Sequence, residues 1–184
     1  MQRQAGFTLI ELLVTTAISL VVLAAVYELF INTNKIYTVQ SKVVNLQQDI
    51  RGAVDIMARD IRMAGLNATE TNATIHAANA TSIRVAYDYN GNGACNGTHE
   101  DVTYTYVAGS DELTMNANTL AGDIQSFDLQ YTLEDGTTTA NPADPGEIRV
   151  VDVNVCGRIS GSYADEHNST YCFTRGVQCR NMGI

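Results

Sequence analysis

The sequence predicts an α+β fold in which one long N-terminal helix is followed by a mostly antiparallel sheet. Two observations support this. No proline interrupts residues 7–64, where apolar residues recur at helical spacing. After Gly65 the chain breaks into short alternating segments with few helix signals. The 184 residues suffice for one membrane helix and one modest globular domain.

Residues 7–31 form an apolar run that is long enough to cross a bilayer, which takes roughly 20 such residues. The short leader, residues 1–6, carries Arg3 and the initiating amine, and this positive charge predicts a cytoplasmic amino terminus. Glu11 lies inside the apolar run. A carboxylate is costly there and indicates a functional site, so we expect a cationic partner for it.

The position of Gly6 suggests where that cation comes from. An ordinary secretory signal carries small residues after its apolar core, whereas Gly6 precedes the run. Cleavage after Gly6 would leave the apolar segment on the mature protein and create an amine at Phe7, four residues from Glu11. The two groups lie about one turn apart within one helix. Between neighbouring subunits, the amine of one could meet the carboxylate of the next.

Residues 32–65 continue the helix as an amphipathic segment. One apolar stripe recurs at spacings of three or four, and Gly65 supplies a signal for the helix end. We expect this half of the helix to pack on the globular domain. The stripe consists of Val39, Val43, Leu46, Ile50, Val54, Met57, Ile61 and Ala64.

Residues 66–184 are predicted to form the β-rich domain. Residues 67–81 are expected to be loop with at most one short strand, and residues 134–146 are expected to be loop. Alternation of apolar and polar residues predicts six strands, over residues 82–87, 101–107, 112–115, 124–133, 149–155 and 170–174.

Composition narrows the possible partners and redox chemistry. The formal net charge is −9 and no basic run is present, so no nucleic-acid partner is expected. The four cysteines follow the membrane segment, as in exported domains where disulfides persist. We expect two disulfides, although four cysteines allow three connectivities. Cys172 and Cys179 are close enough in sequence to clip a terminal loop. The four candidates are Cys95, Cys156, Cys172 and Cys179.

One loop copies the first half of a calcium-binding motif. Asp88, Asn90, Asn92 and Gly93 follow the spacing of EF-hand ligands and their turn glycine. The second half departs from it, because the twelfth position is His99. Calcium is therefore a possible cofactor, and the alternative is a polar hairpin loop. The candidate ligands are Asp88, Asn90, Asn92, the Ala94 carbonyl, and Glu100 or Asp101.

The sequence gives little support for catalysis. His76, His99 and His167 lie in loop-like stretches without a nucleophile at a recognised spacing. No glycine-rich loop opens a helix to hold a phosphate. We therefore expect a protein that is not an enzyme and has no certain cofactor.

The segment Gly-Phe-Thr-Leu-Ile-Glu-Leu-Leu-Val, residues 6–14, resembles the class III leader of type IV prepilins and pseudopilins. The resemblance implies a type IV pilin fold, cleavage after Gly6, and N-methylation of Phe7 by a prepilin peptidase. It also implies that Glu11 neutralises the Phe7 amine of an adjacent subunit during filament assembly.

Three further segments resemble PilW-type minor pilins and the related J-type pseudopilins of type II secretion. They are residues 56–65, residues 88–93 followed by 102–104, and residues 120–131. Many major pilins have a proline near position 28, where this chain has Glu28, and this absence fits a minor pilin or pseudopilin better than a shaft subunit.

The resemblance implies a minor pilin that primes or caps a type IV pilus filament. Its partners would be the prepilin peptidase and other minor and major pilins or pseudopilins. It would reside in the bacterial inner membrane, with its domain in the periplasm, before it joins the filament at the cell surface. Two alternatives are a type II secretion pseudopilin and an adhesive or ligand-binding module at the pilus tip.

Overall fold

The computed structural model describes residues 6–67, 74–95, 97, 99–159 and 170–182. The chain divides into two compact units, Met1–Ser41 and Lys42–Ile184. One helix, α1 (Leu9–Met63), contributes to both units. All strands belong to the second unit, and the fold is α+β, as the sequence predicts.

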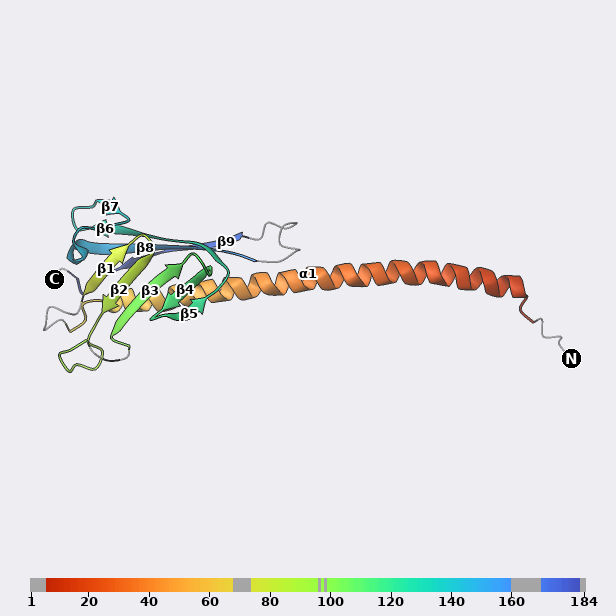
Figure 1. Ribbon diagram of the computed structural model, residues 1–184, viewed down its shortest axis with the longest axis horizontal. Coiled ribbons are helices and arrows are strands. Elements are labelled where there is room, and N and C mark those ends of the chain that lie inside the picture. Colours follow the sequence, from red (N-terminus) through yellow and green to blue (C-terminus); the bar gives the residue numbers. More distant parts are fainter. Residues whose placement is uncertain (1–5, 68–73, 96, 98, 160–169, 183–184) are drawn as a thin grey trace. The chain divides into compact units, whose positions relative to one another are not determined.

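Two antiparallel sheets make up the β-rich part of the second unit (Figure 1). One has five strands in the order β1-β2-β3-β4-β5, and the other has four in the order β7-β6-β8-β9. A short 3-10 helix, η1 (Pro145–Glu147), precedes β8. The strands are β1 (Ile75–Asn79), β2 (Ser82–Ala86), β3 (Asp101–Val107), β4 (Glu112–Met115), β5 (Asn118–Ala121), β6 (Ile124–Leu133), β7 (Thr138–Thr139), β8 (Ile148–Arg158) and β9 (Thr170–Gln178).

The alternation of apolar and polar residues predicted six of the nine described strands. All six predicted strands are present, with β8 and β9 longer than expected. The sequence did not predict β5 or β7, because β7 has only two residues and the four residues of β5, Asn-Thr-Leu-Ala, do not alternate between apolar and polar. The antiparallel strands divide into two sheets, since no strand of the first sheet pairs with one of the second among the described residues.

The predicted apolar stripe of α1 is the centre of the core. Val39 and Val43 are half-buried, whereas the other six stripe residues, from Leu46 to Ala64, are buried. Isoleucine, valine and tyrosine side chains from both sheets complete the core, and Tyr104, Tyr131 and Phe127 are the largest of its fully buried side chains. Burial of this apolar surface is the main favourable contribution to the free energy of folding.

The helix touches both sheets. In the four-stranded sheet, Gly157 of β8 lies so close to α1 that a Cβ there would come within 2.8 Å of the Leu46 and Ile50 side chains. In the five-stranded sheet, the Tyr104 hydroxyl of β3 donates a 2.6 Å hydrogen bond to the buried Asp60 carboxylate. Burial, reinforced by this bond, raises the pKa of Tyr104. The bond supplies the partner that a buried carboxylate requires.

The C-terminal segment packs against the C-terminal end of α1 and caps it. Gly65 follows the helix with a φ of +81°, a left-handed conformation that glycine adopts at little cost. A Cβ on Gly65 would lie 2.9 Å from the Asn181 carbonyl oxygen. The Asn181 side-chain amide donates to the Arg62 carbonyl at 3.2 Å, so this residue satisfies one of the helix's last carbonyls.

We predict that Gly65→Ala lowers the free energy of unfolding by at least about 1–2 kcal/mol, the cost of a left-handed L-residue, because the contact with Asn181 adds to it. Gly52→Ala is the matched control. Gly52 lies inside α1 with nothing within 4 Å of its built Cβ, so alanine should stabilise by up to about 1 kcal/mol. Urea unfolding of the full chain in detergent micelles measures both. Equal effects of the two variants would contradict the role of Gly65.

Candidate functional site

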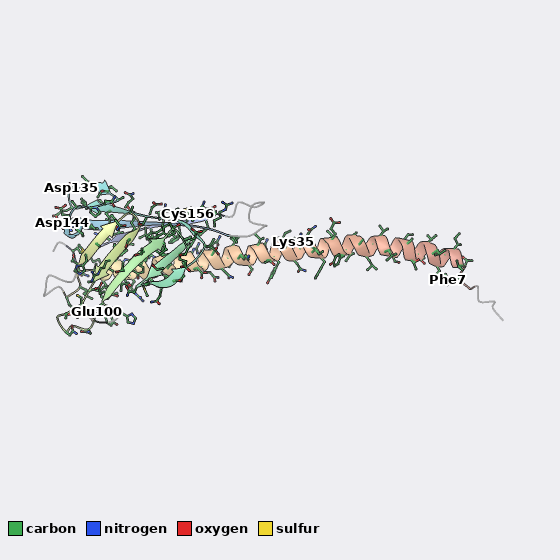
Figure 2. All side chains as sticks on the ribbon, in the orientation of Figure 1. Phe7, Lys35, Glu100, Asp135, Asp144 and Cys156 are labelled. Carbon is green, nitrogen blue, oxygen red and sulfur yellow. A yellow bond between two sulfur atoms is a disulfide. The ribbon has the colours of Figure 1, made fainter. Side chains whose placement is uncertain are left out.

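The predicted cleavage site lies in exposed, non-helical chain. Gly6, Phe7 and Thr8 precede the helix, which begins at Leu9. The Phe7 side chain is 89% exposed, and Figure 2 shows it projecting at the start of α1. A peptidase needs such an accessible, extended segment around the bond it cleaves. The leader residues 1–5 lie outside the described residues.

Thr8 and Glu11 form a reciprocal capping box at the start of α1. The Glu11 carboxylate oxygen Oε2 accepts hydrogen bonds from the Thr8 backbone N–H and the Thr8 hydroxyl, each at 2.9 Å. In return, the Thr8 hydroxyl oxygen accepts from the Glu11 backbone N–H at 3.3 Å. Thr8 is therefore the N-cap and Glu11 the third helical residue, the arrangement that satisfies donors left open at a helix start.

The sequence analysis missed this contact although its signal was present. Threonine followed three residues later by glutamate, just before an apolar run, is the pattern of a capping box. Glu11 was interpreted only through its predicted cationic partner. The structure shows that its carboxylate is held by its own chain.

The apolar residues that follow are exposed within the chain. An 18-residue window of α1 has a mean hydropathy of 2.5, and none of it is buried in the protein. Length and composition allow this part of α1 to cross a membrane. Its large side chains from Leu9 to Phe30 include nine that are more than 60% exposed, namely Leu9, Ile10, Leu12, Leu20, Val21, Leu23, Tyr27, Leu29 and Phe30.

The loop between β2 and β3 is built on two buried carboxylates. Asp88 and Glu100 are each only 3% exposed. Asp88 Oδ1 accepts from the backbone N–H of Gly91 at 2.8 Å and of Asn92 at 3.2 Å, and Oδ2 accepts from that of Gly93 at 2.9 Å. These bonds define a tight turn that the asparagine- and glycine-rich sequence allows.

Glu100 organises the other side of the same loop (labelled in Figure 2). Its Oε1 accepts from the Asn90 backbone N–H at 3.1 Å, and its Oε2 accepts from the Gly97 backbone N–H at 2.7 Å. The side chains of Asn90 and Asn92 also turn back onto the loop, because each accepts from the backbone N–H two residues on, at 2.9 and 2.8 Å.

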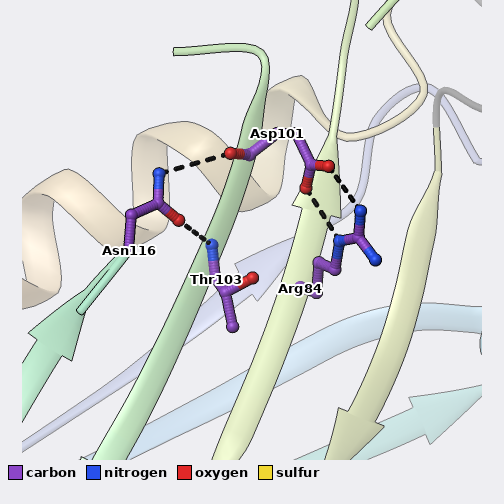
Figure 3. Close-up of polar contacts among 4 residues, drawn as sticks. All are labelled: Arg84, Asp101, Thr103 and Asn116. Atoms are coloured by element: carbon purple, nitrogen blue, oxygen red, sulfur yellow. Dashed lines mark hydrogen bonds and ion pairs between the residues drawn. The ribbon is translucent and has the colours of Figure 1, made fainter. Parts of the chain in front are cut away.

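Asp101, the last candidate calcium ligand, points to a different partner (Figure 3). Its two carboxylate oxygens pair with the Arg84 guanidinium, one of them at 2.8 Å from Nε. This pairing lowers the pKa of Asp101. The Asn116 side chain bridges the adjacent backbone, accepting from the Thr103 N–H at 2.8 Å and donating to the Asp101 carbonyl at 3.3 Å.

The six candidate ligands therefore do not converge as one coordination shell. The carboxylates of Asp88 and Glu100 accept backbone N–H groups, Asp101 is ion-paired, and no cluster of three acidic, histidine or cysteine side chains suited to a metal occurs in the described part of the chain. The geometry is that of the polar hairpin alternative. Calcium binding stays a prediction.

One of the two expected disulfides is present. Cys156 of β8 and Cys172 of β9 are directly opposite in the antiparallel ladder and are bonded, with their Cα atoms 4.0 Å apart. Cys95 and Cys179 are thiols, and burial raises the pKa of Cys179 to about 11. A predicted disulfide between Cys172 and Cys179 is wrong, because Cys172 is bonded to Cys156. The seven residue steps from Cys172 to Cys179 also run along an extended strand and span about 23 Å, far beyond disulfide reach.

Comparisons with known families agree with this geometry. Residues 1–27 match the prokaryotic N-terminal methylation motif. Residues 39–154, more than half of the chain, match prepilin peptidase-dependent protein B. The chain belongs to the prepilin peptidase-dependent protein B family. Comparison with curated proteins gave no match.

Membership in the prepilin peptidase-dependent protein B family makes the chain a type IV pilin-like minor pilin, the family that the leader and the three further segments resemble. The two matched families are structural, pilin-like proteins rather than enzymes, and they imply processing by a prepilin peptidase and assembly with other pilins. The exposed segment at the predicted cleavage site and the unburied apolar helix are features that such processing and membrane anchoring require.

We predict that Thr8→Val frays the first turn of α1, because the valine side chain has nearly the same shape but can neither accept from the Glu11 N–H nor donate to the Glu11 carboxylate. The expected cost is about 1 kcal/mol. Amide hydrogen exchange of Leu9–Leu12 in micelles measures it, and should be faster in the variant. Thr8→Ser keeps the hydroxyl and is the control. Unchanged exchange in Thr8→Val would contradict the capping box.

We predict that Asp88→Asn lowers the free energy of unfolding by about 1–3 kcal/mol even with a calcium chelator present, because an amide nitrogen would face backbone donors that a carboxylate oxygen accepts. Thermal unfolding with chelator and with added calcium measures it. Wild-type stability of the variant in chelator would refute the role of Asp88. A rise with calcium in the wild type alone would establish the calcium site.

Proposed function

We propose that this chain is a minor pilin that primes or caps the assembly of a type IV pilus filament. Its pilin-like family supports the general role in filament assembly. The observation that carries the mechanism is the position of Glu11, a carboxylate on the first turn of a helix whose following residues are apolar and exposed.

Hydrolysis of the Gly6–Phe7 bond leaves a carboxylate on Gly6 and a new amine on Phe7. Methylation of that amine by the prepilin peptidase keeps its positive charge. The mature chain then begins two residues before α1, so a cation and a carboxylate are separated by a single turn.

The capping box leaves Glu11 able to take a second partner. Both hydrogen bonds from Thr8 go to Oε2, and no described residue donates a hydrogen bond to Oε1. A Phe7 amine from a neighbouring subunit can donate to Oε1 while the box stays intact. Pairing the two charges offsets the large desolvation cost of placing Glu11 in an apolar helix bundle, which gives assembly a defined axial register.

The apolar residues around Glu11 supply the rest of the interaction. They remain exposed in the single chain, and in this proposal they exchange lipid contacts for contacts with neighbouring helices. No catalytic step by this chain is required. Membrane insertion would hold the subunit until a partner's amine becomes available.

We predict that Glu11→Gln leaves membrane insertion intact but reduces recovery in sheared filaments at least tenfold, because a neutral amide cannot neutralise the neighbour's amine, and loss of a buried ionic partner is worth more than 1.4 kcal/mol. Glu28→Gln is the matched control, a second carboxylate exposed on the same apolar part of α1. Quantitative immunoblots of filament and membrane fractions measure both variants.

The mass of the mature amino terminus is recorded in the same samples, and methylated Phe7 is the expected first residue. Filaments that contain Glu11→Gln at the wild-type level would refute the assembly role of Glu11. An intact leader in the wild type would refute the processing step.

A further inference from the structure

The C-terminal strand β9 forms the one long, regular sheet edge among the described strands. It has nine residues and pairs with β8 alone, without a break in register. The other three edges are short or irregular. β7 has two residues and leaves residues 124–130 of β6 without a strand partner on that side, but this part of β6 carries a register shift and its Leu129 N–H donates to the Ala80 carbonyl. β5 has four residues and lies beside a register shift, and β1 carries a register shift of its own.

The pairing of β9 with β8 shows which of its backbone groups are free. The Cα atoms of Cys156 and Cys172 are 4.0 Å apart, the short spacing of a non-hydrogen-bonded pair in an antiparallel ladder. Because the two pair types alternate, every second residue of β9 directs its N–H and C=O away from β8. These residues are Thr170, Cys172, Thr174, Gly176 and Gln178, and all five are exposed.

This outward row has none of the features that usually block edge pairing. It contains no proline, no charged side chain and no bulge. Its side chains are small or neutral. A free edge of this length is a template for one more strand, and natural proteins normally protect such an edge.

The strand is also held rigidly for docking. The disulfide fixes it to β8, and its other face is anchored on α1. The Arg51 side chain donates to the Tyr171 hydroxyl at 3.2 Å and lies 6.0 Å from the Phe173 ring centroid, while Arg175 is ion-paired with Asp55. Preorganisation of this kind lowers the entropic cost of adding a strand.

We propose that β9 is a docking strand, onto which another pilin-like subunit adds an extended, uncharged strand by main-chain hydrogen bonds. The assignment rests on the proposed function, since it takes the partner from filament assembly. It adds to that function a lateral contact between globular domains, separate from the Glu11 contact.

The direction of β9 argues for a different subunit rather than a second copy. Contacts of Arg51 with Tyr171 and of Asp55 with Arg175 show that β9 runs in the same direction as the part of α1 beside it. Symmetric antiparallel pairing of two β9 strands would therefore run the two α1 helices in opposite directions. Subunits anchored in one membrane by the same end need parallel helices.

The experiment compares Thr174→Pro with Thr174→Ala in the full chain. Both variants lose the Thr174 hydroxyl bond to Asn154 Oδ1, but proline alone removes the outward N–H and adds bulk at the edge. We expect Thr174→Pro to reduce recovery in sheared filaments about tenfold, as for loss of one or two hydrogen bonds, and Thr174→Ala to match the wild type. The amount of each variant in the membrane fraction and the presence of its Cys156–Cys172 disulfide show whether the variant has folded.

A photo-crosslinker placed at Gln178 provides a second measurement that needs no proline, with Gln130 on β6 as the control position, exposed but away from the edge. The expected result is an adduct from position 178 to a sheet-edge strand of another pilin-like subunit, and none from position 130. An adduct with a second copy of this chain, or no adduct, would overturn the inference even if Thr174→Pro fails to fold.

These experiments give different results when the docking-strand proposal is wrong and when the proposed filament role is wrong. Entry of Thr174→Pro into filaments at the wild-type level, with Glu11→Gln excluded, would overturn the docking strand and leave the filament role standing. Absence of the wild type from filaments would count against the filament role. In that case, the crosslink from position 178 in the membrane fraction would test the docking-strand proposal independently.

Discussion

The burial of one face of α1 against two sheets is the constraint on which the globular unit depends. Residues from Leu46 to Ile61 present a continuous apolar stripe, and no single sheet covers it. Contact with β8 requires the missing side chain of Gly157, and contact with β3 requires a partner for Asp60, which Tyr104 supplies. The helix thus contacts both sheets, through β8 in one and β3 in the other.

Three carboxylates in different parts of the chain are satisfied in the same way, by backbone N–H groups. Asp88 and Glu100 accept backbone N–H groups inside the globular unit, and Glu11 accepts the Thr8 N–H at the start of α1. A backbone donor left unpaired in an apolar setting also costs free energy, so each contact satisfies both groups. Glu11 differs from the others in one respect, because only one of its oxygens is used by the described residues.

The elements with a long periodic signal could be predicted from the sequence. The helix and strands β3, β4 and β6 have the predicted bounds or nearly so, because apolar spacing over many turns or alternation flanked by turn residues specifies them locally. The division into two sheets could not be predicted. It depends on pairing between segments far apart in sequence, such as Val155 with Phe173, which local patterns do not encode.

The candidate site shows the same division between local and distant information. Residues 6–11 carry their predicted chemistry in their spacing, so a cleavage position and a functional acid could be predicted from the sequence alone. In the β2–β3 loop the spacing of oxygen atoms left calcium ligation and a polar hairpin both open, because spacing alone does not say whether a backbone N–H or a cation meets each oxygen. Asp101 of β3 is paired with Arg84 of β2, and this contact exists only when the two strands are side by side in the folded sheet. A motif made of turn residues therefore predicts a loop's shape before it predicts its ligand.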